Sequence, residues 1–149
     1  ALMSLCYAIA LFHRTAFSAI APTLQAEFAL SAAESADLAA LRFWTALCVM
    51  IPLGLLADVV GARRVAIGGT LTSAIGTLLF RDADSVVMLA LGRVLVAVGS
   101  TAAFIALMRY VSTTFPARKA AYSGRGIFVG NVGAVASGAP LALLLAVLA

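Results

Sequence analysis

Five long apolar runs, separated by short polar breaks, dominate the chain and limit what it can fold into. A helix needs about 20 mostly apolar residues to cross the hydrocarbon core of a bilayer. Because lipid offers no hydrogen-bond partners, each crossing segment must satisfy its own backbone groups, as a helix does. We therefore predict an all-α membrane protein with five transmembrane helices, at about residues 1–21, 36–57, 65–80, 86–111 and 124–148.

The balance of polar and apolar residues excludes a water-soluble globule. Hydrophobic residues make up 64% of the 149 residues and charged residues only 11%, whereas a soluble domain carries about 25% charge. The basic residues behind the net charge of +4 are scattered between apolar runs, so no nucleic-acid partner is expected. Cys6 and Cys48 lie inside apolar runs and imply no disulfide framework. The expected partner is the lipid bilayer.

Lysine and arginine are distributed unequally among the expected loops. Arg81 is the one basic residue in the first and third loops, whereas six lie in or beside the second and fourth. These six are Arg63, Arg64, Arg109, Arg118, Lys119 and Arg125. Cytoplasmic loops carry the excess of basic residues. We therefore place the second and fourth loops in the cytoplasm and the protein in a plasma membrane, with the bacterial inner membrane as the expected location.

The helix ends and the helix number carry two further expectations. The first helix is expected to stop at Pro22, because proline interrupts helical hydrogen bonding. The third run is short, and snorkelling of Arg63 and Arg64 can extend it. Five is an odd number of helices and the chain does not begin with Met. We therefore expect a fragment that lacks a sixth helix and a C-terminal half.

Three arginines lie within the apolar runs. From the expected outer helix ends, Arg14 lies about 12 Å deep, Arg42 about 9 Å and Arg93 about 10 Å, at 1.5 Å per residue. Intramembrane charges usually face a cavity or a partner. No acid lies at this depth, so the three predict a positive cavity suited to a carboxylate or phosphate. Alternatively, Arg42 snorkels to the surface and Arg93 hydrogen-bonds backbone carbonyls of a neighbouring helix; Arg14, the deepest, is the main candidate for substrate binding.

Further candidates for substrate contact follow from helical spacing. Tyr7, Arg14 and Ser18 share one face of the first helix, at intervals of seven and four residues. His13 lies about 100° away on that helix, where it either lines the cavity and helps to bind substrate or faces the helix packing. It either takes part in proton transfer or is a hydrogen-bonded structural residue. Asn131 lies in the apolar middle of the fifth helix, where it either contacts substrate or ties two helices together.

The turn between the second and third helices, Gly54-Leu-Leu-Ala-Asp58-Val-Val-Gly61-Ala-Arg63-Arg64, is rich in charge. Asp58 ends a helix, where the macrodipole is already negative, so it needs a compensating cation. Gly61 permits the positive φ of a short reversal. Arg63 and Arg64 are expected to return towards Asp58, and Arg109 is another candidate partner. The cluster is either a gate that opens and closes as helices rock or a static cap.

Small residues recur at helix-packing intervals, and catalytic motifs are missing. Gly126, Gly130, Gly133 and Ser137 form one stripe, and Gly92, Gly99, Ala103 and Ala106 form another. Such stripes let transmembrane backbones approach closely, and we assign them to packing. The sequence has no nucleophile elbow, no phosphate-binding loop and no metal-spaced His, Cys and Asp set. We expect no enzyme activity, no metal and no cofactor.

Several motifs resemble those of the major facilitator superfamily. The Gly54–Arg64 turn resembles the cytoplasmic signature between helices two and three of that family, with Val59 and Ala62 where basic residues are common. Gly92-Arg93-Val-Leu followed by Gly99 is similar to the fourth-helix arginine motif, with Val96 and Ala97 replacing Gln-Gly. Gly130-Asn-Val-Gly133 through Gly138-Ala-Pro140 resembles the fifth helix. The resemblance implies helices one to five of a six-helix N-terminal bundle in a twelve-helix transporter.

A narrower resemblance concerns the substrate. Arg14-Thr-Ala-Phe17 followed by Pro22 resembles the first helix of organophosphate/phosphate antiporters and related organic-anion transporters. Thr-Thr-Phe-Pro-Ala-Arg118-Lys119 and Asn131-Val-Gly133 are similar to segments of the same group. This resemblance implies that Arg14 binds the substrate anion.

The function expected from these observations is secondary active transport of a small solute by alternating access, with an organic acid or phosphate ester bound near the midplane. One alternative is a proton-coupled exporter of drugs or sugars, in which Arg14 is structural. Another is a non-transporting membrane receptor or scaffold, or a complete five-helix protein.

Overall fold

The structure, a computed structural model, describes residues 2–137, without the side chains of residues 2, 14, 16–21, 27 and 136. Its elements are α1 (Leu2–Glu27), α2 (Ala32–Val60), α3 (Ala62–Arg81), α4 (Val86–Thr114), the 3-10 helix η1 (Pro116–Arg118) and α5 (Lys119–Ser137). Residues 2–137 contain no strand. The all-α fold predicted from the apolar runs is confirmed over this range.

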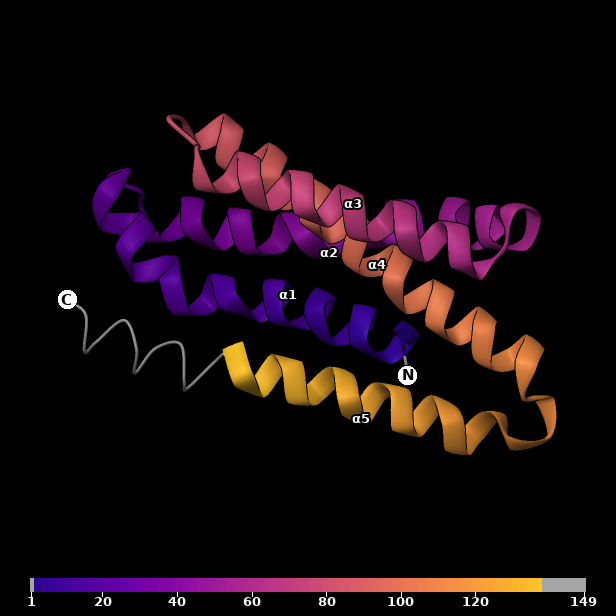
Figure 1. Cartoon of the computed structure of the whole chain (residues 1–149). Helices are drawn as coiled ribbons and strands as arrows, with labels where there is room; N and C mark the ends of the chain where they lie inside the picture. Colours follow the sequence, from indigo (N-terminus) through magenta and orange to yellow (C-terminus); the bar gives the residue numbers. More distant parts are fainter. Residues whose placement is uncertain (1, 138–149) are drawn as a thin grey trace.

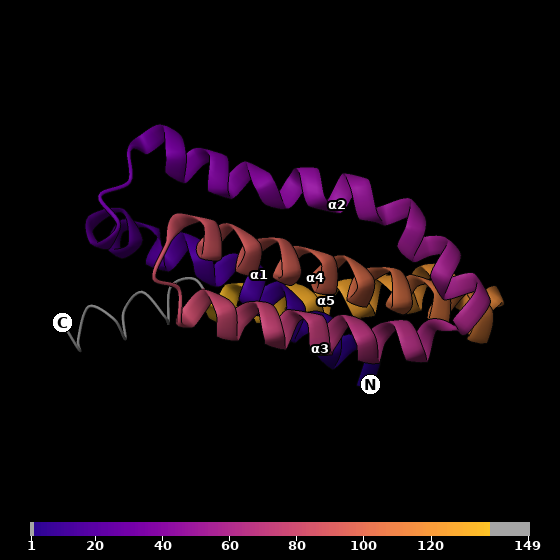
Figure 2. The ribbon, with the colours of Figure 1, turned by 90° about the horizontal axis from the view of Figure 1, so that it is seen from above.

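The helices alternate in direction along the chain. The α2–α3 and α4–α5 turns lie at one end of the bundle, and the α1–α2 and α3–α4 connections lie at the other (Figure 1). The central helix is α4, which packs against all four other α-helices and most extensively against α3. The principal neighbour of α5 is α1. Figure 2 shows α2 and α3 meeting at their turn and diverging away from it.

The start of the bundle differs from the sequence-based prediction. Instead of stopping at Pro22, α1 continues to Glu27 with the proline inside it. An internal proline costs about 3 kcal/mol, but the added turn keeps backbone groups hydrogen-bonded, as the Phe28 N–H does by donating to the Leu24 carbonyl oxygen at 3.0 Å. Residues 32–35 are helical too, because Ser31 and Glu34 form a capping box. The Glu34 backbone N–H donates to Ser31 Oγ at 3.2 Å, and the Ser31 N–H donates to Glu34 Oε2 at 2.8 Å.

The remaining helix ends lie within a few residues of those predicted. Two helices begin earlier than expected, α3 at Ala62 and α5 at Lys119, and α4 ends later, at Thr114. The predicted end of the fifth helix at 148 lies outside the described residues, as do Gly138 and Pro140. By length and composition, α2 and α4 are able to cross a membrane. Large apolar side chains are exposed along α2, among them Phe43, Trp44, Leu47, Ile51 and Leu55.

Glycine allows α3 and α4 to touch backbone to backbone. A Cβ atom built at Gly76 would lie 2.8 Å from the carbonyl oxygen of Gly92. At Gly99 a Cβ would collide with the Gly69 carbonyl oxygen and the Ser73 hydroxyl. Small residues on both helices are therefore needed for this contact. The predicted packing role of Gly92 and Gly99 is confirmed, and Gly69 and Gly76 complete the interface from the α3 side.

The stripe on α5 packs in the same way against α1. A Cβ at Gly130 would collide with the ring of Tyr7, and one at Gly133 with the Ala8 carbonyl oxygen. Further along, the hydroxyls of Thr15 and Ser137 are hydrogen-bonded, and the Thr15 hydroxyl also contacts the Ala134 carbonyl oxygen at 3.3 Å. The predicted packing role of this stripe is confirmed as well.

Candidate functional site

A cavity of about 240 Å³ lies between α1, α2 and α4. Its lining residues are Tyr7 and Leu11 from α1; Arg42, Phe43, Ala46 and Met50 from α2; and Ser100, Thr101 and Phe104 from α4. Within each helix these residues are separated by intervals of one, three or four, so each helix presents one face to the cavity. Mostly apolar walls with a few polar groups are typical of small-molecule sites.

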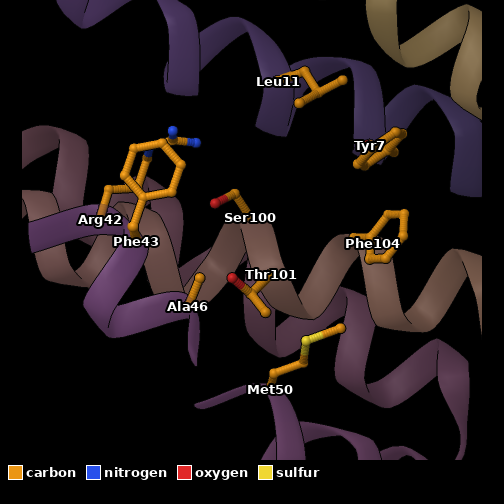
Figure 3. Close-up of a pocket in the computed structure, with 9 residues that line it drawn as sticks. All are labelled: Tyr7, Leu11, Arg42, Phe43, Ala46, Met50, Ser100, Thr101 and Phe104. Atoms are coloured by element: carbon orange, nitrogen blue, oxygen red, sulfur yellow. The ribbon is translucent and has the colours of Figure 1, made fainter. Parts of the chain in front are cut away.

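The guanidinium of Arg42 lies at one end of this cavity, and residues with hydroxyl groups lie further along it (Figure 3). Figure 3 shows Arg42 beside Phe43 at one end, Tyr7 and Phe104 at the other, and Ser100 and Thr101 between them. The Arg42 Cζ atom lies 4.1 Å from the centroid of the Phe43 ring, within cation–π range. A guanidinium has hydrogen-bond donors and no acceptor. Among the lining residues that the structure describes, none is an acid.

The two hydroxyls in the cavity wall are bonded to their own helix. Both Ser100 Oγ and Thr101 Oγ1 donate to the Ala97 carbonyl oxygen, at 3.0 Å and 2.8 Å. With their protons engaged, the two oxygens face a ligand as acceptors. The cavity therefore offers cationic donors at one end and neutral acceptors beside them. In the sequence, Ser100 and Thr101 are two adjacent polar residues inside an apolar run. Because neither is charged, a prediction based on charged residues does not identify them.

The residues predicted to contact substrate are only partly brought together. Tyr7 lines the cavity, and its ring lies 5.6 Å from that of Phe104, centroid to centroid. His13 does not line the cavity; its ring lies edge-on to Phe12, 6.0 Å away. Asn131 is exposed on α5 and does not line the cavity either. The side chains of Arg14 and Ser18 lie outside the described part of the structure.

The other two arginines within the apolar runs, Arg42 and Arg93, have different surroundings. Arg93 is buried, and its Nε donates to the Leu38 carbonyl oxygen at 2.9 Å. It therefore ties α4 to α2, and the prediction that Arg93 bonds a backbone carbonyl of a neighbouring helix is confirmed. Arg42, by contrast, is half-buried and faces the cavity. Of the three arginines predicted to form one layer, Arg93 therefore takes part in packing one helix against another.

At the far end of the same helices lies the α2–α3 turn. Gly61 ends α2 and begins α3 with φ of 87°, so the predicted positive φ is confirmed. The Asp58 carboxylate pairs with Arg109 of α4, with Oδ1 and Nε 3.0 Å apart. Within residues 2–137 neither Arg63 nor Arg64 forms an ion pair with Asp58; both are exposed. They lie in the first turn of α3, which starts directly after Gly61.

The Asp58–Arg109 pair borders a shallow cavity of about 430 Å³ at this end of the bundle. The side chains of the pair are about half exposed, at 54% for Asp58 and 44% for Arg109. Gly54 and Lys119 line the same cavity. An exposed ion pair of this kind contributes about 0–1 kcal/mol to stability. The pair is therefore a weak and breakable link between α2 and α4.

Comparison with known proteins bears on the family. Residues 3–149 match the family model of the Major Facilitator Superfamily. No curated protein and no solved structure matches the chain. The match covers nearly the whole chain, and the long apolar helices α2 and α4 agree with it. The chain therefore belongs to the Major Facilitator Superfamily of integral membrane proteins, whose members are in general secondary transporters.

Proposed function

We propose that this chain supplies substrate-binding helices to a secondary transporter of a small organic anion, an organic acid or a phosphate ester. The cavity between α1, α2 and α4 carries this proposal. Its wall contains the Arg42 guanidinium, and the lining residues that the structure describes include no acid. Guanidinium binds carboxylate and phosphate through paired hydrogen bonds. The resemblance of the Arg14 segment to organic-anion transporters supports the same substrate class.

Arg14 is the second cation of the proposed site. It follows Tyr7 by seven residues and Leu11 by three in one continuous helix, α1. Because this spacing returns to the same helix face, Arg14 extends the face that contributes Tyr7 and Leu11 to the cavity. Ser18 continues that face by another turn. His13 and Asn131 remain candidates for contacts made when the site is closed.

The proposal includes a membrane orientation. Each of the five helices α1 to α5 crosses the bilayer, and the α2–α3 and α4–α5 turns lie in the cytoplasm of a bacterial cell. The two turns occupy one end of the bundle (Figure 1), and this end carries Arg63, Arg64, Arg109, Arg118 and Lys119. The excess of basic residues supports its cytoplasmic placement. Alternating access then requires a second helical bundle that closes over the cavity, here the C-terminal half of the transporter.

Replacing Arg42 tests the proposed site. In proteoliposomes that contain the full-length protein, Arg42→Gln is expected to raise KM for a transported carboxylate or phosphate ester about tenfold, since it removes one charged hydrogen bond of about 1.5 kcal/mol. Arg81→Gln is the matched control, because Arg81 is exposed and pairs only locally with Asp82 at 3.6 Å. Uptake of an uncharged sugar or drug with an unchanged KM in Arg42→Gln would instead favour the proton-coupled exporter.

A second experiment addresses the Asp58–Arg109 pair. If the pair holds one state of the transport cycle, Asp58→Asn and Arg109→Gln each change the transport rate about fivefold, the upper range for a half-exposed ion pair. The double variant is then no worse than either single one, because both remove the same contact. Additive effects on the rate, or unchanged rates together with a lowered Tm, would show that the pair is a static cap.

A further inference from the structure

A second groove, of about 390 Å³, lies on the other side of α4, between α2 and α3. Leu53, Leu56 and Val60 of α2 form one wall, and Val98 and Ala102 of α4 form the floor. No residue with a described side chain lines both this groove and the Arg42 cavity. Direct contacts between α2 and α3 are few compared with those that either helix makes to α4. The space between the two helices is therefore bounded mainly by apolar side chains over α4.

The third wall of the groove, from α3, has one charged end. Arg64 is exposed and lines the groove beside the α2–α3 turn. As far as the described residues go, it makes no ion pair. Among the lining residues that the structure describes, the only other polar side chain is that of Thr72, whose hydroxyl donates to the Gly68 carbonyl oxygen at 2.8 Å. An occupant of this groove thus meets a cation at one end and apolar surface along the rest.

The dimensions and surroundings of the groove fit one lipid chain. Arg64 and Thr72 are eight residues apart, or about 12 Å along the helix axis. This length fits within one leaflet, which is about half of the 30 Å hydrocarbon core. Next to the groove, α3 exposes Ile67, Leu71 and Ile75, so its outer face is apolar on a chain that belongs to a membrane family.

We propose that this groove binds an anionic phospholipid, with the phosphate on Arg64 and one acyl chain lying between α2 and α3 over α4. The charge of Arg64 selects an anionic head group, because basic side chains at the membrane interface attract such lipids. A small polar anion does not suit the whole groove, because its lining is mainly apolar and the Thr72 hydroxyl already donates to a carbonyl of its own helix. The bound lipid supplies contacts that α2 and α3 do not make with each other.

Cross-linking of lipids to the full-length protein tests this site. The probes are phosphatidylglycerol and phosphatidylcholine with the same photoactivatable acyl chain, incorporated in turn into nanodiscs. We expect peptides containing Leu53–Val60 and Arg64–Thr72 to be labelled by phosphatidylglycerol about fivefold more than by phosphatidylcholine, the preference of one basic residue at an anionic surface. Equal labelling by the two probes, or no labelling of these peptides, would overturn the proposal.

Three variants separate this site from general attraction to basic residues. Arg64→Gln is expected to abolish the preference, and the neighbouring Arg63→Gln to keep it, because Arg63 does not line the groove. Gly68→Leu is expected to reduce labelling by both probes, since its side chain enters the groove. A Cβ at Gly68 meets nothing within 4 Å, so the fold tolerates the change. Equal losses in Arg63→Gln and Arg64→Gln, or unchanged labelling of Gly68→Leu, contradict the proposal.

Discussion

Gly99→Val is expected to abolish the folded state. The first atom of the new side chain would collide with Ser73 Oγ and the Gly69 carbonyl oxygen, and would lie 2.8 Å from the Ser73 backbone nitrogen. Two of these three atoms belong to the α3 backbone, so no rotamer change relieves the clash. Overpacking a core costs about 1–3 kcal/mol where side chains can move. Here a whole helix has to shift, and total stabilities are only about 5–15 kcal/mol.

The matched control is Gly68→Val, since it introduces the same side chain into the neighbouring helix α3, where a Cβ meets nothing within 4 Å. The measurement is the yield of monodisperse protein in detergent by fluorescence-detected gel filtration, followed by Tm. We expect Gly99→Val to be aggregated or absent and Gly68→Val to resemble the wild type. Similar yields and Tm values for the two variants would show that α3 and α4 are not packed backbone to backbone.

Arg14→Ala is expected to lower kcat/KM for an anionic substrate about 100-fold or more. Truncating one partner of a buried charge pair costs about 2–5 kcal/mol, and the proposed site places Arg14 deeper in the membrane than Arg42. Arg14→Lys keeps the positive charge but loses the planar fork that binds an anion bidentately. It is therefore expected to retain part of the activity, about a tenth, through one charged hydrogen bond.

The measurement is initial uptake into proteoliposomes at several substrate concentrations, normalised to the amount of reconstituted protein. Arg125→Ala is the control, because Arg125 is exposed on α5 and stacks over Tyr122 at 5.5 Å, away from the cavity. Wild-type uptake of an anion by both Arg14→Ala and Arg14→Lys would remove Arg14 from the binding site. A binding site centred on Arg42 alone would then remain.

Much of the fold can be predicted from sequence periodicity and from the local chemistry of single residues. Gly61 marks the reversal between two helices because only its backbone readily adopts positive φ, and the small-residue stripes identify the packed faces. The hydrogen bond from Arg93 to a backbone carbonyl oxygen was also predictable, since a buried guanidinium needs an acceptor. The sequence does not predict that α1 continues through Pro22, because a proline usually marks the end of a helix. The Ser31–Glu34 capping box has a sequence signature, a serine followed three residues later by a glutamate, which marks the start of α2 at Ala32.

The candidate site was less accessible from the sequence. That Tyr7, Arg42 and Ser100 line one cavity depends on how three helices are rotated against one another, and helical spacing within one segment does not determine this rotation. The choice of Arg109 over Arg63 and Arg64 as the partner of Asp58 has the same origin. Proximity in sequence favoured the two arginines of the turn, whereas the direction in which α3 leaves Gly61 decided the pairing.

The bond from Arg93 to the Leu38 carbonyl gives α2 a fixed point near one end. Asp58 lies 20 residues further along α2, about 30 Å from Leu38 at 1.5 Å per residue. If α2 pivots about Leu38, a tilt of about 4° moves Asp58 by about 2 Å over that lever arm. This displacement is enough to separate the 3.0 Å ion pair with Arg109. Arg42 is only four residues from the pivot, so a small displacement beside the proposed anion site is amplified several-fold at the opposite end of the helix.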